Sequence, residues 1–173
     1  AERAILGALQ GLGVVKEGFD VDEMVEKRLG AVFMPHGLGH FIGCDTHDVG
    51  GYLLGYPERS DKPGLKSLRT SRIMEENMTI TVEPGCYFID HLMDEALNCP
   101  VLSEYLIKEK MEEFRGFGGV RLEDVVLVTS GGCENLTNCP RTVKEVEHVM
   151  KGGKWPPIKD EAPQLKRKYL TTC

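Results

Sequence analysis

The pattern of apolar and polar positions predicts two helices near the start of the chain. Apolar side chains recur at helical spacing across residues 2–12, and glycines end that run. A second apolar stripe follows Asp20, which has capping-box spacing to Glu23, and it stops at Gly30. The short apolar run that comes next, residues 31–34, is typical of a buried strand.

Later segments alternate between strand and helix patterns. Residues 78–83 alternate with a period of two, so Glu83 ends a predicted strand on its polar face. Pro84-Gly85 predicts a turn and residues 86–89 a returning strand. The remaining predicted elements are a mostly helical stretch at 91–114 broken near Pro100, a strand pair or bulged strand at 118–129, and a helix at 141–150 capped by Thr142. Helices and strands in no regular alternation indicate an α+β fold.

The length of 173 residues fits one domain, which we place at residues 1–151. Residues 52–66 contain prolines and charges and predict a surface loop. The tail, residues 152–173, holds three prolines and a basic run at 166–168. It is expected to be loosely ordered unless Trp155 or Tyr169 docks it.

Composition narrows the possible functions. A net charge of -6 argues against a general nucleic-acid binder and against docking on anionic lipid. No apolar run approaches the length that spans a bilayer, and the start of the chain lacks a signal peptide. The six cysteines form no C-x-x-C pair, so we expect free buried thiols and a cytoplasmic location. Because the chain begins without Met inside a helical pattern, we interpret it as truncated or processed.

Three groups of residues could carry chemistry. His36, His40 and His47 fall in a glycine-rich segment, and an extended backbone would put the first two on one face. Glu83 ends a strand, and Glu123 shares a strand face with Arg121, which could hold that carboxylate ionised. One imidazole and two carboxylates suit divalent ions such as Mn, Co, Mg or Zn. The plainer alternatives are a glycine-rich loop with incidental histidines and a surface ion pair.

Several ordered motifs resemble the pita-bread metallopeptidases, and most closely the eukaryotic prolidases, which are Xaa-Pro dipeptidases. The motifs are residues 33–40, 47–52, 67–70, 81–85, 87–91 and 115–121. The resemblance implies the C-terminal portion of a pita-bread domain, with a curved antiparallel sheet covered by helices. It also implies hydrolysis of Xaa-Pro dipeptides through a hydroxide bridging two metal ions, with Mn²⁺ expected and Co or Zn possible.

The resemblance assigns roles by position. His40, Glu83 and Glu123 would be metal ligands, and Glu83 would also shuttle a proton. His47 would contact the substrate and help to stabilise the tetrahedral intermediate, with His36 beside it. Arg69 would hold the free carboxylate of the dipeptide. Arg121 would orient Glu123 or contact the substrate.

The chain departs from the family at two ligands. The family site uses five, two of them aspartates upstream of the first histidine motif, whereas residues 1–35 contain only Asp20 and Asp22. Those two have the context of a helix cap and of a first-turn charge. We therefore expect this chain to bind one metal ion or none, to be inactive or nearly so, and to lack the N-terminal domain.

Further expectations concern assembly and alternative functions. The parent protein would be a homodimer, and apolar sheet surface exposed by truncation would favour self-association of this chain. The nearest alternative function is that of an aminopeptidase P, which removes an N-terminal residue before proline. The other is a non-catalytic pita-bread binding module, which the retained ligands argue against.

Overall fold

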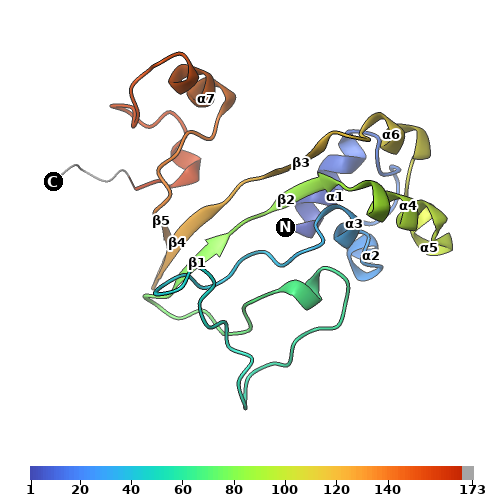
Figure 1. The fold of residues 1–173 in the computed structure, drawn as a ribbon, viewed down its shortest axis with the longest axis horizontal. Coiled ribbons are helices and arrows are strands. Elements are labelled where there is room, and N and C mark those ends of the chain that lie inside the picture. The colour runs from blue at the N-terminus through green and yellow to red at the C-terminus, as the bar shows by residue number, and fades with distance from the viewer. Residues whose placement is uncertain (169–173) are drawn as a thin grey trace.

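Six helices gather at one end of the molecule. The computed structural model describes residues 1–168, and Figure 1 shows these helices packed around one end of a long strand ribbon. They are α1 (Glu2–Gly11), α2 (Val21–Glu26), α3 (Gly30–Phe33), α4 (Asp90–Asn98), α5 (Pro100–Ser103) and α6 (Lys108–Glu113). A 3-10 helix (Leu65–Ser67) lies in the long loop region. Among residues 1–168, no helix is long and apolar enough to cross a bilayer.

The strands form an antiparallel ribbon that runs through the molecule. The strands are β1 (Thr79–Val82), β2 (Gly85–Phe88), β3 (Gly118–Arg121), β4 (Asp124–Thr129) and β5 (Gly132–Asn135). β4 pairs with β1 and β5, and β3 pairs with β2. With the surrounding helices, this architecture confirms the predicted α+β class.

The β1–β4 pair and the β2–β3 pair have the same register, although a break at residues 83–84 and 122–123 separates them. Val82 pairs with Asp124 on one side of the break, and Gly85 pairs with Arg121 on the other. The backbone N–H of Leu122 donates to the Pro84 carbonyl at 3.0 Å. Glu83 therefore lies directly opposite Glu123, and side chains at such positions are neighbours across a sheet.

The core of the helical end fixes the position of β2. Phe88 is buried there, stacked on Phe114 with ring centroids 4.2 Å apart and edge-on to Phe33 at 5.8 Å. Since successive side chains of a strand point to opposite faces, the neighbouring Tyr87 points away from this core. Its face of the ribbon is the one that carries Glu83.

A smaller unit occupies the other end of the molecule (Figure 1). Helix α7 (Val143–Met150) is capped by Thr142, as predicted, and Glu145 completes a capping box that was not predicted from the sequence. Beyond it, the indole N–H of Trp155 donates to the Asn138 carbonyl at 3.0 Å, and buried Arg167 forms an ion pair with Glu145 at 2.7 Å. A short 3-10 helix, Pro163–Leu165, lies between them. Trp155 thus docks the tail through residue 168, while Tyr169 lies outside the described residues.

Several local predictions were wrong. Residues 31–34 are not a strand, because the run forms α3 and is buried by its packing against the core. Helix α2 ends at Glu26 instead of Gly30, and Glu23 accepts from the Tyr105 hydroxyl at 2.7 Å instead of completing a capping box. Pro84-Gly85 makes no hairpin, because β2 continues the line of β1. The five described cysteines are free, as predicted, but none is fully buried.

Candidate metal centre

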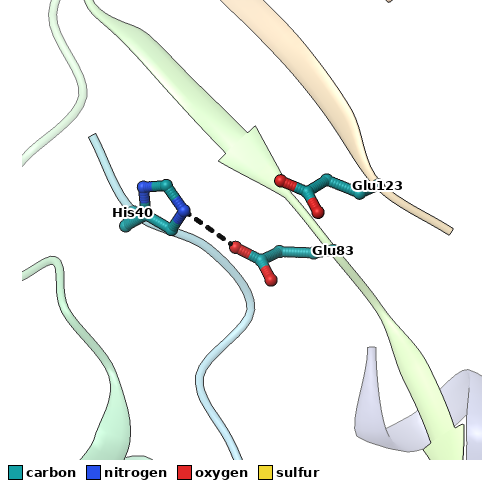
Figure 2. Close-up of side chains that lie close together, drawn as sticks. All are labelled: His40, Glu83 and Glu123. Carbon is teal, nitrogen blue, oxygen red and sulfur yellow. Dashed lines mark ion pairs between the residues drawn. The ribbon is translucent and has the colours of Figure 1, made fainter. Parts of the chain in front are cut away.

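Three side chains that could bind a metal ion meet at the break in the ribbon. His40, Glu83 and Glu123 each offer a ligand atom, and these atoms all lie within 4.8 Å of one another. Figure 2 shows the imidazole and the two carboxylates facing a common space from three separate segments of the chain. His40 and Glu83 are buried, whereas Glu123 is exposed. The cross-strand register explains the Glu83–Glu123 proximity, but it does not bring His40 to the site.

His40 reaches the site because residues 38–42 run along the free edge of β1. Thr81 N–H donates to the His40 carbonyl at 2.8 Å, and Phe41 forms an antiparallel bridge with Ile80. This segment is extended, in agreement with the prediction that glycines would disfavour a helix here. Gly39 is required for the close approach, since a Cβ there would lie 1.8 Å from the Thr81 carbonyl oxygen.

The imidazole of His40 is oriented as a metal ligand. Its Nδ1 lies 2.9 Å from the Phe41 carbonyl oxygen, an acceptor, so Nδ1 carries the proton. Nε2 is the other ring nitrogen; it lies 3.2 Å from Oε1 of Glu83, and it would offer its lone pair to a metal ion bound beside that carboxylate. A histidine that binds a metal through one nitrogen usually donates the N–H of the other to a carbonyl or carboxylate, and Nδ1 of His40 is placed for such a bond.

Both oxygens of Glu83 are held in place. Oε1 accepts from the Thr81 hydroxyl at 2.9 Å, and Oε2 accepts from Nη1 of Arg121 at 2.9 Å. These two bonds fix the plane of a carboxylate whose side chain is only 10% exposed. Arg121 therefore positions Glu83, whereas the sequence predicted that it would orient Glu123 or contact the substrate.

Tyr87 links Arg121 to His36. Nε of Arg121 donates to the Tyr87 hydroxyl oxygen at 2.6 Å, and that hydroxyl lies 3.0 Å from Nε2 of His36. Since Arg121 can only donate, the phenol proton points to His36, whose Nδ1 proton is directed to the Gly37 carbonyl at 2.7 Å. The hydrogen bond to Tyr87 raises the pKa of Arg121, and the Glu83 and Glu123 carboxylates add to this effect.

Tyr87 was not among the candidate residues from the sequence, although a signal for it existed. Its ring lies across two glycines: a Cβ at Gly85 would be 2.2 Å from the hydroxyl, and one at Gly119 would be 2.3 Å from Cδ1. Gly119 is the cross-strand partner of Tyr87, and Gly85 is that of Arg121. Two glycines on one face of a strand pair, beside an aromatic residue and an arginine, leave room for such a ring.

A pocket of about 200 Å³ brings six of the seven candidate residues together. The exposed imidazole of His47 packs edge-on against His40 with ring centroids 4.4 Å apart. Arg69 is also exposed and comes from a loop segment that packs close to Gly50. The candidates that line the pocket are His36, His40, His47, Arg69, Glu83 and Arg121, with Gly37, Gly39 and Ser67.

The group of His40, Glu83 and Glu123 fits a divalent cation. It offers one imidazole nitrogen and two carboxylates, a donor set suited to hard or borderline ions. Among residues 1–168, no aspartate joins it. Asp20 instead caps α2 by accepting from the Asp22 N–H at 2.8 Å, and the Asp22 carboxylate pairs with Arg3. Both aspartates therefore have the structural roles expected from the sequence.

Known metallopeptidases resemble this chain in sequence. Residues 2–130 match the model of metallopeptidase family M24. The chain is 56% identical over 152 residues to the Xaa-Pro dipeptidase of Homo sapiens, covering 88% of this chain and 30% of the relative. It is 39% identical to the probable Xaa-Pro aminopeptidase pepP of Penicillium rubens, over 86% of this chain and 31% of that protein.

Solved structures of related aminopeptidases resemble the fold. The structure of Pseudomonas aeruginosa aminopeptidase PepP superposes with a TM-score of 0.60 at 34% identity, covering 87% of this chain and 27% of that one. The helices and antiparallel strands of the chain thus correspond to part of a pita-bread domain. The chain spans about 30% of the length of the curated relatives it matches.

Proposed function

Because the chain belongs to metallopeptidase family M24, we propose that it carries part of the catalytic centre of an Xaa-Pro dipeptidase. The observation that carries this proposal is the meeting of His40, Glu83 and Glu123, whose ligand atoms lie within 4.8 Å of one another. Residues 1–151 form this catalytic part, and residues 152–173 are an appended tail. Cleavage would separate proline from the residue before it.

We propose that the metal is Mn²⁺ and that it would be held by His40, Glu83 and Glu123. A complete site would contain two such ions. Divalent ions bound there supply an activated water and stabilise charge on the reacting carbonyl. The buried carboxylate of Glu83 is placed to accept a proton and to pass it to the leaving amine. Arg121, held by Tyr87, keeps that carboxylate in one orientation during the transfer.

The remaining pocket residues bind the substrate. His47 lies beside His40 at the open side of the pocket, where its imidazole can donate to the oxygen that gains negative charge. His36, fixed by Tyr87, lines the same pocket. Arg69 is a cation at its rim, suited to bind the free carboxylate of a dipeptide.

A dipeptidase is favoured over an aminopeptidase P by two considerations. Identity to the human dipeptidase is 56%, against 39% to the fungal aminopeptidase. Arg69 also lines the pocket, and its cation would suit the free carboxylate of a dipeptide better than the uncharged amide of a longer peptide. The retained ligand group argues against a non-catalytic binding module.

Replacing Arg69 with Met is expected to weaken binding of Gly-Pro by about 10–100-fold, the size of one lost charge-assisted hydrogen bond. Binding of Gly-Pro-amide should change little, because it lacks the carboxylate. Nuclear magnetic resonance titrations of the metal-free chain measure both. Lys66→Met is the matched control, because this exposed cation lies in the same loop segment but outside the pocket. Equal loss for both ligands would rule out carboxylate recognition by Arg69.

The 173-residue chain alone is expected to hydrolyse no Gly-Pro, even with excess Mn²⁺. Three ligands without two bridging aspartates cannot hold two ions in the arrangement that activates water. Release of free proline, followed by chromatography, measures this directly. Turnover that disappears in Glu83→Gln would contradict the expectation.

We place the complete enzyme in the cytoplasm as a homodimer, with the free thiols of Cys44 and Cys133 exposed. The isolated chain would self-associate through apolar side chains on β3 and its flanks. Phe117, Val120 and Leu122 are each more than half exposed there. Light scattering of the purified chain tests the association.

A further inference from the structure

We propose that the hydroxyl of Thr81 is a positioning group that sets both His40 and Glu83 for metal binding. This inference rests on the proposed metal site and adds to it a residue that binds no metal itself. Thr81 lies on β1, two residues before Glu83, and its side chain is only 1% exposed. A threonine at this depth needs a partner for its hydroxyl, because burying an unpaired polar group is costly.

The hydroxyl of Thr81 connects the two ligands directly. Its oxygen accepts from the backbone N–H of His40 at 2.9 Å, and its proton is directed to Oε1 of Glu83, also at 2.9 Å. One donor and one acceptor are thereby used. The same Oε1 faces Nε2 of His40 at 3.2 Å (Figure 2). Thr81 therefore holds the carboxylate oxygen that points to the imidazole.

The hydrogen bond from the His40 N–H to the Thr81 hydroxyl replaces a backbone–backbone hydrogen bond of the antiparallel pairing. Thr81 N–H donates to the His40 carbonyl at 2.8 Å, and Glu83 N–H donates to the Leu38 carbonyl at 2.7 Å, as in an antiparallel pair. The returning bond from His40 N–H goes to the Thr81 side chain, because Gly39 packs against the carbonyl that would otherwise accept it. The backbone at His40 is thus anchored by a side chain that also fixes Glu83.

Arg121 completes the arrangement from the other side. It holds Oε2 of Glu83 while Thr81 holds Oε1, so neither oxygen can rotate away from the site. Thr81 differs from Arg121 in that it also anchors the backbone of the second ligand. Loss of its hydroxyl would release two ligands at once, whereas loss of Arg121 would release one.

Thr81→Val tests the proposal, because valine keeps the branched shape and removes the hydroxyl. Mn²⁺ affinity of the chain is expected to fall by about 10–100-fold, the usual result of changing a group that orients metal ligands. Thr81→Ser should retain affinity within about threefold, since it keeps the hydroxyl. Thr79→Val is the matched control, because Thr79 lies on the same face of β1 and contacts neither ligand.

A second readout needs no metal. In the metal-free chain, Thr81→Val should lower hydrogen-exchange protection of the His40 amide and shift the ¹⁵N resonance of its Nε2, and Thr81→Ser should restore both. Equal behaviour of Thr81→Val and wild type in these signals would overturn the proposal. So would equal losses in the Val and Ser variants, which would indicate packing alone. Absence of any Glu83-dependent Mn²⁺ binding in the wild type would instead overturn the metal site, while the amide signals still decide the role of Thr81.

Discussion

Glu83→Gln is expected to lower the affinity of the chain for Mn²⁺ by at least about 100-fold, the upper end of what changes in ligand-orienting groups cause. Glu83 is the buried carboxylate of the group, and both of its oxygens are fixed before metal arrives. Glutamine keeps the shape but loses the charge and one acceptor. Electron paramagnetic resonance of free Mn²⁺ measures the affinity.

Glu123→Gln provides a graded comparison. Glu123 is exposed, so water can take its place at the ion, and we expect a loss of about tenfold at that site. Glu76→Gln, on an exposed turn away from the site, should have no effect. Equal affinities for Glu83→Gln and Glu76→Gln would show that Glu83 holds no metal.

Arg167→Ala is expected to destabilise the C-terminal unit by about 3 kcal/mol. The Arg167 side chain is 1% exposed and pairs with buried Glu145 at 2.7 Å and half-buried Asp160 at 2.6 Å, so its removal leaves two carboxylates without their cation. Trp155, the single tryptophan, lies 5.4 Å from the guanidinium and reports on this unit by fluorescence during urea unfolding. Lys144→Ala removes an exposed ion pair and should cost less than about 1 kcal/mol.

The same variant should change the response to acid. Hydrogen bonds from Arg167, and from backbone N–H groups of Arg141 and Thr142, lower the pKa of Glu145 from 4.5 to about 2. A lowered pKa stabilises the folded state fully above pH 4.5, and this stabilisation is lost as the pH falls from there towards 2. The stability difference between wild type and Arg167→Ala should shrink over that range. A difference that stays constant down to pH 2 would contradict the assigned pairing.

The elements that sequence reasoning predicted best are those with a strong local signal. The cap at Thr142 formed as expected, and so did the alternating strand, which ends at Val82, one residue before the predicted Glu83. The run at residues 31–34 failed because apolar residues in a short segment cannot distinguish a buried strand from a buried helix. Whether such a run becomes a strand or a helix depends on its packing, and here it packs as a helix in the core.

The pairing of charged residues could not be read from the sequence. Arg121 and Glu123 lie two positions apart, which suggests a pair on one strand face, but the register places Glu83 diagonal to Arg121 across the ribbon. That geometry depends on Pro84 continuing the strand line instead of turning it. Motif order nevertheless singled out His40, Glu83 and Glu123, residue types suited to divalent ions, and the structure brings these three together.

We propose that His40, Glu83 and Glu123 together bind a metal ion in this chain. The most direct test is a titration of the purified 173-residue chain with Mn²⁺, with Gly-Pro hydrolysis measured in the same samples. We predict one ion per chain, weakly bound, and no turnover. No saturable binding, or two ions per chain with hydrolysis, would contradict this account of the site.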